Sequence, residues 1–119
     1  TDTGVAGLAW EAWSPQRQAE LLAQGRPVFV DFTAAWCVTC QYNKRTTLAD
    51  ERVLADAAGK NVALLRADWT RRDPTVTQAL AALGRNGVPV YALYKTGQPV
   101  QVLTEVLRVD EVRAALAAL

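Results

Sequence analysis

The only two cysteines of the chain, Cys37 and Cys40, are three positions apart and follow the apolar run "VFVDF". Thiols at this spacing can supply half of a zinc site, form a structural disulfide or serve as a reversible redox couple. A structural zinc site has four ligands, nearly all of them thiolate or imidazole, and a chain with two cysteines and no histidine provides only two. We therefore predict that this pair holds no metal.

A disulfide between Cys37 and Cys40 would close a very short loop, which removes little chain entropy from the unfolded state. Such a bond is a weak structural cross-link. The same short loop keeps the second thiol close enough to attack a mixed disulfide on the first, which suits a reversible couple. If a helix begins at Cys37, both sulfurs lie on one helical face with Cα atoms roughly 5 Å apart, within disulfide range.

A helix start at this point would make the two thiols chemically different. Unpaired backbone N–H groups and the positive end of the helix dipole would stabilise a thiolate at Cys37, whereas Cys40, one turn further, would be more covered. The pattern favours redox chemistry over a structural bridge, with Cys37 as the accessible nucleophile and Cys40 as the resolving thiol. No further cofactor is expected, because the two sulfurs of a redox-active disulfide carry both electrons.

The elements that must position this pair alternate between helix and strand. Helices are predicted at 14–25, 37–48, 50–59, 73–84 and 110–119, with N-caps at Ser14, Asp50, Asp73 and Asp110. Strands are predicted at 28–32, 61–69, 88–94 and 95–105, the last two joined by a hairpin at Thr96-Gly97, with a further short strand near 5–10. This alternation indicates one α/β domain over 1–119, with a mixed sheet between two layers of helices.

The composition argues against binding to nucleic acid or to a charged membrane surface. The net charge of +1 and the pI of about 7.7 give no electrostatic basis for binding nucleic acid or anionic lipid. The pair Arg71-Arg72, next to Asp73, is interpreted as a solvated loop. Methionine is absent. This leaves two origins open: a chain trimmed of its initiator before Thr1, or a domain cut from a larger membrane protein.

The stretch "VDFTAAWCVTC", followed about fifty residues later by "GVP", resembles the thioredoxin superfamily over nearly the whole chain. The resemblance implies a thioredoxin-like fold, with a parallel half and a C-terminal antiparallel hairpin in its central sheet. In that family the proline is cis and packs across from the cysteines, so the resemblance implies a cis Val88-Pro89 bond. An ordinary trans proline at a strand edge is the alternative. The partner-binding surface is expected to be small and apolar, formed by Trp36, Val38, Gly87, Val88 and Pro89.

Within that superfamily, Val38-Thr39 and the stretches "LADERVLADA" and "ADWTRRDP" are similar to the C-terminal periplasmic domains of DsbD-type thiol:disulfide interchange proteins. The resemblance implies a dithiol reductase relay that exchanges disulfides with partner proteins. In such a relay a membrane-embedded domain of the same protein donates electrons. An N-terminal immunoglobulin-like domain accepts them and serves periplasmic isomerases and cytochrome c biogenesis.

The same resemblance implies a periplasmic location as part of an inner-membrane protein, and we expect the isolated domain to be a monomer. Two other interpretations stay open. One is a general thioredoxin-like reductase or an oxidant of other partners. The other is a thioredoxin-fold binding module whose cysteines have no redox role.

Asp31 lies within an apolar strand, where a carboxylate is costly to bury. In thioredoxin-like proteins an acid at this place exchanges protons with the resolving cysteine, so the resemblance implies that role for Asp31 toward Cys40. General thioredoxins offset the acid with a lysine on the next strand, and the matching position here is Leu64. Leucine cannot offset the acid, and we therefore expect the pKa of Asp31 to lie well above that of a free carboxyl. An aspartate at the strand edge that caps a loop is the alternative.

Lys44 lies one helical turn after Cys40, where DsbD-type domains often carry an acid. A lysine directed toward the active site would favour a thiolate, whereas a lysine directed into solvent would have no such effect. The sequence leaves both placements open, and any tuning that the family acid provides is in doubt here.

Overall fold

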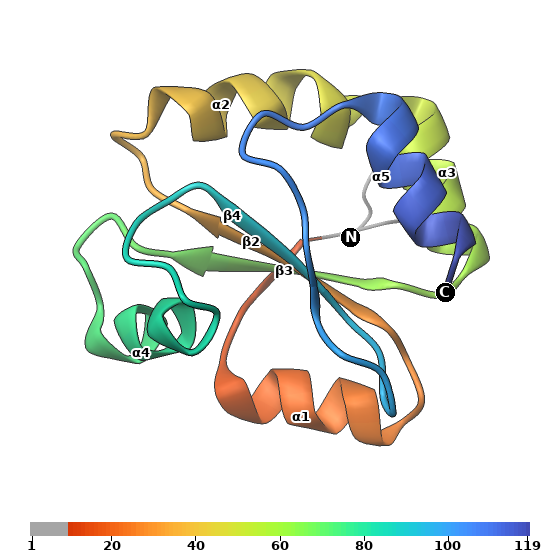
Figure 1. Ribbon diagram of the computed structural model, residues 1–119, viewed down its shortest axis with the longest axis horizontal. Helices are drawn as coiled ribbons and strands as arrows, with labels where there is room; N and C mark the ends of the chain where they lie inside the picture. The colour runs from red at the N-terminus through yellow and green to blue at the C-terminus, as the bar shows by residue number, and fades with distance from the viewer. Residues whose placement is uncertain (1–9) are drawn as a thin grey trace.

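The computed structural model describes residues 10–119 as a five-stranded sheet with helices on both faces (Figure 1). The strands are β1 (Glu11–Ala12), β2 (Val28–Thr33), β3 (Ala63–Asp68), β4 (Val90–Tyr94) and β5 (Gln101–Val102). The helices are α1 (Pro15–Ala23), α2 (Val38–Arg45), α3 (Glu51–Gly59), α4 (Pro74–Ala82) and α5 (Val109–Ala117), with a 3-10 turn, η2, at Thr47–Ala49. None of the helices in this part of the chain is both long and apolar enough to cross a bilayer.

The strand order β1-β3-β2-β4-β5 places β2 at the centre of the sheet. It runs parallel to β3 and antiparallel to β4, while β1 pairs in parallel with β3 and β5 pairs in antiparallel with β4. The predicted mixed sheet, with a parallel half and a closing antiparallel half, is confirmed. The strand expected near 5–10 lies outside the described residues apart from Trp10, and the first described strand begins at Glu11.

Three of the four expected N-caps cap their helices. The side chains of Ser14, Asp50 and Asp73 accept backbone N–H groups of the first turns of α1, α3 and α4. The fourth prediction is wrong, because α5 begins at Val109 after Arg108 and Asp110 lies inside the first turn. There its carboxylate accepts the N–H of Glu111 and still interacts favourably with the helix dipole.

The strand expected over 95–105 is reduced to Gln101–Val102. The hairpin turn is present, with Gly97 in the left-handed region at φ 81°. Pro99 has no N–H to give to a ladder, which shortens the pairing. After the backbone N–H of Leu103 donates to the carbonyl of Tyr91, the chain leaves the sheet and runs toward α2.

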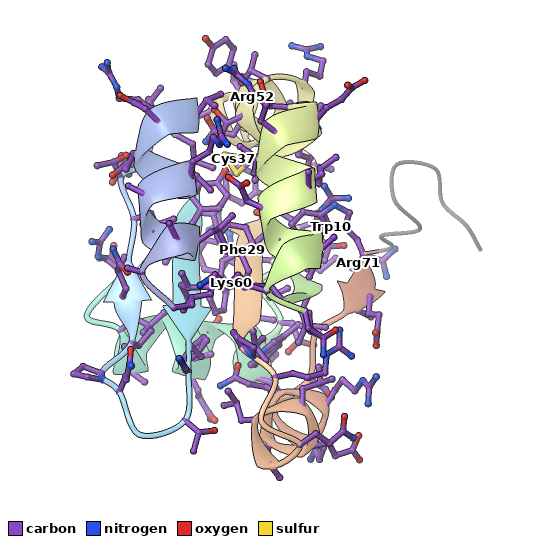
Figure 2. The ribbon with its side chains drawn as sticks, turned by 90° about the vertical axis from the view of Figure 1, so that its right-hand side faces the viewer. Trp10, Phe29, Cys37, Arg52, Lys60 and Arg71 are labelled. Carbon is purple, nitrogen blue, oxygen red and sulfur yellow. A yellow bond between two sulfur atoms is a disulfide. The ribbon has the colours of Figure 1, made fainter. Side chains whose placement is uncertain are left out.

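Side chains of β2 alternate between two cores. Val28, Val30 and Phe32 pack on the face covered by α1 and α4. Phe29 packs on the opposite face, beneath α3 and α5, which lie side by side in front of it in Figure 2. Asp31 has the same parity as Phe29, and therefore lies on the face covered by α2, α3 and α5.

A buried asparagine fastens α2 to the rest of this layer. The amide nitrogen of Asn43 donates to the hydroxyl of Tyr91 (2.7 Å) and to the carbonyl of Glu105 (2.8 Å), and its oxygen accepts the N–H of Leu107 (3.2 Å). The hydroxyl of Thr47 also donates to the carbonyl of Leu107. Because α2 begins beside the cysteines, these hydrogen bonds also fix the pair relative to the sheet.

Candidate active site

Cys37 is the N-cap of α2, so the helix begins at Val38, one residue later than expected. Its extended backbone (φ −89°, ψ 110°) ends the loop after β2, and its N–H donates to the carbonyl of Ala34. The sulfur of Cys37 accepts the backbone N–H of Cys40 at 3.1 Å. A thiolate at this position would receive that hydrogen bond and the positive end of the helix dipole.

Cys37 and Cys40 form a disulfide with their Cα atoms 5.2 Å apart, drawn in yellow beside the Cys37 label in Figure 2. Cys37 is the more accessible of the two residues: it is 7% exposed, whereas Cys40 is fully buried. An incoming sulfur can therefore approach Cys37 and not Cys40. This geometry matches the expected division between an attacking and a resolving thiol.

The loop before β4 covers the other side of the disulfide. Val88 packs against the buried cluster of Ala34, Cys37 and Cys40, and the Val88–Pro89 peptide bond is cis, as predicted. A cavity of about 240 Å³ opens beside this loop and is lined by residues 85–90 and Glu105. Gly87 and Val88 are half-buried, while Pro89 is buried.

The exposed part of the site is apolar. Trp36 is 49% exposed and Val38, at the first position of α2, is 82% exposed. Tyr42, one helical turn after Val38, is also half exposed. The structure thus brings together Trp36, Val38 and the 87–89 loop around Cys37, and adds Tyr42. The sequence analysis did not include Tyr42 in this surface. Its spacing of four residues from Val38 could have placed it there, because residues four apart lie on the same face of a helix.

Asp31 lies in the strand beneath α2, and its side chain is fully buried. The strand register places it opposite Arg66 of β3 and Tyr91 of β4. The guanidinium of Arg66 donates through Nε to Oδ2 of Asp31 at 3.2 Å, while Oδ1 has no hydrogen-bond partner within residues 10–119. The aspartate is therefore not a loop cap at a strand edge.

Leu64 does not offset Asp31, as expected, but another residue of β3 supplies a cation that the sequence analysis did not identify. Leu64, the position that matches the thioredoxin lysine, pairs with Phe29 and belongs to the core, and Arg66 supplies the cation two residues later. Arg66 reaches the acid while its guanidinium stacks over the ring of Trp10, with the guanidinium carbon 4.2 Å from the ring centroid. Its side chain is 33% exposed, so solvent still hydrates part of the charge.

Burial raises the pKa of Asp31, and this effect exceeds the opposite effects of the Arg66 charge, the Arg66 hydrogen bond and the Lys44 charge. The direction agrees with the expectation from the sequence, although the offsetting cation was not anticipated. A carboxyl with a raised pKa can accept a proton at neutral pH more readily than an exposed one.

Lys44 is half-buried on α2. Its charge lowers the pKa of Asp31 and also that of Asp68, at the end of β3. Both acids therefore lie close enough to Lys44 for its charge to act on them, while the direction of its amine relative to the two sulfurs stays a prediction.

Replacing Arg66 by Gln is expected to raise the pKa of Asp31 further, because the carboxylate loses its cation and its charged hydrogen bond. The step in which Asp31 accepts a proton should then require a higher pH. We expect the ascending limb of the pH–rate profile for disulfide reduction to move to higher pH. The measurement is the pH dependence of the rate at which the reduced domain reduces a protein disulfide.

The matched control is Arg66→Lys, which keeps a positive charge near the acid and should shift the profile less. An Arg66→Gln variant whose profile coincides with that of the unmodified domain would show that Arg66 does not control Asp31. A uniform loss of rate at every pH would indicate a structural defect instead.

Within residues 10–119, no three or more Cys, Asp or Glu side chains come together to hold a metal ion. The Cys37–Cys40 disulfide is the redox group that the structure presents. That no other cofactor takes part stays a prediction.

Comparison with known proteins identifies relatives of this arrangement. A family model described as thioredoxin-like matches residues 9–96. The thiol:disulfide interchange protein DsbD of Vibrio cholerae is 36% identical over 83 residues, which is 69% of this chain and 14% of the relative. The chain thus spans about a seventh of the length of that curated relative.

Solved structures with the same fold include domains of DsbD. The oxidised C-terminal domain of Neisseria meningitidis DsbD superposes with a TM-score of 0.74 and 20% identity, covering 92% of this chain and 98% of that domain. The reduced form of the same domain gives 0.73 at the same identity and coverage. At this identity the superposition shows a shared fold.

Proposed function

We propose that this chain, which belongs to the thioredoxin-like family, works as a dithiol reductase relay. The proposal is supported by its similarity, as a disulfide oxidoreductase domain, to the C-terminal domain of DsbD. In the proposed relay the domain receives two electrons from an upstream dithiol and delivers them to the disulfide of a partner protein. The alternative directions, a general reductase or an oxidant, use the same pair of sulfurs.

The first step is attack by Cys37 as a thiolate on one sulfur of the partner's disulfide. A mixed disulfide forms between Cys37 and the partner, and the partner's other sulfur leaves as a thiolate and takes up a proton. Trp36, Val38 and the 87–89 loop are proposed to contact the partner around this bond. The strand-like backbone next to Pro89 would receive the partner's peptide in this step.

In the second step Cys40 loses its proton and attacks the sulfur of Cys37. The mixed disulfide breaks, the Cys37–Cys40 disulfide forms, and the partner departs with both of its sulfurs reduced. Asp31 is proposed to accept the proton of Cys40, because it lies buried beneath α2 with one oxygen that no described residue engages. An upstream dithiol then reverses these steps on the oxidised domain.

The observation that carries the proposal is the position of the Cys37 sulfur at the N-cap of α2, 3.1 Å from the N–H of Cys40, with Cys40 buried beneath it. This position stabilises a thiolate on the reachable sulfur only. A structural cross-link would need no such difference between its two sulfurs.

The similarity to DsbD supports the proposed setting of the domain. We propose a membrane-embedded electron donor and an immunoglobulin-like acceptor domain within the same protein, and a periplasmic location. Cytochrome c biogenesis is then one process that the delivered electrons would serve.

The reduction potential of the Cys37–Cys40 couple tests the direction of flow. A relay that reduces its partners should have a potential nearer to that of thioredoxin, about −270 mV, than to that of the strong oxidant DsbA, about −120 mV. The measurement is the ratio of oxidised to reduced domain in glutathione buffers of known potential, read by thiol alkylation. A value close to that of DsbA would assign the domain to oxidation and contradict the relay.

A further inference from the structure

Arg72 lies over a pair of tryptophan rings at the edge of the active site. Its guanidinium carbon is 5.2 Å from the ring centroid of Trp36 and 5.2 Å from that of Trp69. The two rings contact one another with centroids 6.0 Å apart and an interplanar angle of 54°. A guanidinium in this position is attracted by both ring faces.

The loop that carries Arg72 is fastened to the loop that carries the cysteines. The N–H of Trp69 donates to the carbonyl of Thr33 (2.7 Å), and the N–H of Ala35 donates to the hydroxyl of Thr70 (2.8 Å). The indole N–H of Trp36 donates to the carbonyl of Thr70 (3.0 Å). Both loops lie at the end of the sheet where β2 and β3 terminate (Figure 1).

The backbone of Arg72 also favours this position. Its φ of 53° lies in the left-handed region, and its N–H donates to the carbonyl of Trp69. Trp36 immediately precedes Cys37, so the ring that Arg72 contacts belongs to the loop that carries the reachable sulfur. A partner that docks over Cys37 and Trp36 would therefore meet the guanidinium at the edge of that surface.

The guanidinium of Arg72 forms no hydrogen bond and no ion pair within residues 10–119. The nearby acids have other partners: Asp68 accepts the N–H and the hydroxyl of Thr70, and Asp73 caps α4. The fork of N–H groups on an arginine matches the two oxygens of a carboxylate. Rings beneath the guanidinium hold its plane and exclude water from that side.

The loop after β3 carries charges of both signs, with the carboxylates of Asp68 and Asp73 engaged by Thr70 and by the first turn of α4. Arg71 adjoins Arg72, and α2 carries Lys44 and Arg45 with no acidic residue between Val38 and its end. Glu105 lines the cavity beside the 87–89 loop. Because the two acids of its own loop have other partners, the guanidinium of Arg72 is available to a carboxylate of a partner segment.

We propose that Arg72, held over Trp36 and Trp69, is a recognition residue that binds a carboxylate of the partner protein close to the disulfide being reduced. This inference rests on the proposed function and specifies its substrate class: disulfides flanked by aspartate or glutamate. Arg72 is exposed, as the interpretation of a solvated loop requires, and the proposal adds a binding role to it.

The test uses three cyclic peptides that differ only in the residue next to the disulfide, which is Glu, Gln or Lys. Reduction by the pre-reduced domain at low ionic strength should have a kcat/KM about fivefold higher for the Glu peptide than for the Lys peptide. Arg72→Gln should remove most of this preference, and Arg72→Glu should reverse it. High salt should weaken the preference of the unmodified domain.

The control variant is Arg26→Gln, because Arg26 precedes the opposite end of β2. Its charge is removed equally, and it should leave the preference unchanged. A preference that persists in Arg72→Gln, or an unmodified domain that does not distinguish the peptides, would overturn the assignment.

A second measurement tests the binding of the peptides without any disulfide reduction. Peptides with S-methylated cysteines cannot react, and calorimetric titration of the oxidised domain measures their binding alone. Tighter binding of the Glu peptide, lost in Arg72→Gln, supports the recognition role even if no peptide is reduced, in which case only the proposed function fails. Equal binding of the three peptides would contradict the recognition role even if all of them are reduced.

Discussion

Replacing Cys37 by Ala is expected to abolish disulfide reduction, and replacing Cys40 by Ala is expected to stop the reaction after its first step. Cys37 is the sulfur that a partner can reach, so without it no mixed disulfide forms. Without Cys40 the thiolate of Cys37 still attacks, but nothing within the domain releases the partner. The two variants should therefore fail in distinguishable ways.

The rate of reduction of a protein disulfide should fall at least about 10³-fold in Cys37→Ala, because the nucleophile itself is removed. In Cys40→Ala a covalent adduct with the partner should accumulate. Non-reducing mass spectrometry detects this adduct, and reduction of the sample releases it. Trp36→Ala serves as a control, since it alters the docking surface and leaves both sulfurs in place.

These variants also separate the relay from a redox-inert binding module. A module that only binds would keep its partner and its cellular role in Cys37→Ala. The opposite assignment of the thiols would be indicated if Cys40→Ala turned over while Cys37→Ala accumulated the adduct. Either observation would contradict the roles that burial and the N-cap position assign.

Replacing Asp31 by Asn is expected to slow the resolution of the mixed disulfide about 10²-fold near neutral pH. General-base assistance contributes about 10²–10⁴ to reactions of this kind, and an amide cannot accept the proton of Cys40. The first step, attack by Cys37, should be affected much less. Rapid-mixing measurements that follow formation and decay of the mixed disulfide separate the two steps.

The same substitution should change how stability depends on pH. The folded-state pKa of Asp31 lies above its ordinary value, so over the interval between the two values the folded chain keeps a proton that the unfolded chain has lost. Stability contributed by this group is fully present below the ordinary pKa and is lost as the pH rises through the raised one. The amide side chain introduced by Asp31→Asn does not titrate, and the variant domain should lack this loss.

The measurement is the free energy of unfolding in urea at a series of pH values for both proteins. Because acids such as Asp50 and Asp68 titrate in both, the difference between the two curves isolates Asp31. The difference should favour the Asp31→Asn variant increasingly as the pH rises. Parallel curves would mean that Asp31 ionises in the folded domain as easily as in the unfolded chain.

Much of the site could be predicted because its signals are local. The three-residue spacing of Cys37 and Cys40, and a helix start next to them, follow from neighbouring residues and the rules of helix termini. The alternation of helices and strands predicts the architecture in the same way. The family pattern placed Val88-Pro89 opposite the pair, and the structure has its cis bond there.

The partner of Asp31 could not be predicted because it depends on strand register. A shift of two residues along β3 keeps the side-chain face and exchanges Leu64 for Arg66, so apolar periodicity does not distinguish the two. An arginine within "ALLRAD" was nevertheless the one cation of that strand. The hydrogen bonds of Asn43 could not be predicted either, because no residue near position 43 indicates that its partners lie at positions 105 and 107.

The position of Arg72 over two tryptophan rings also could not be predicted from the sequence. Its sequence neighbours, Arg71 and Asp73, are charged and typical of a solvated loop. Only the approach of the loops after β2 and β3 brings two indole rings beneath the guanidinium. A surface recognition residue can thus lack any local signature when its support comes from two segments of the chain.

The hydrogen bonds of Asn43 bear on how the domain is made. Its partners at Glu105 and Leu107 follow it by 62 and 64 residues, so during synthesis the helix with the cysteines emerges long before the segment that fastens it. Until then both thiols belong to an unanchored chain and can pair with whatever cysteines lie nearby. A nascent domain would therefore acquire its selective chemistry last, after nearly all of its residues have left the ribosome.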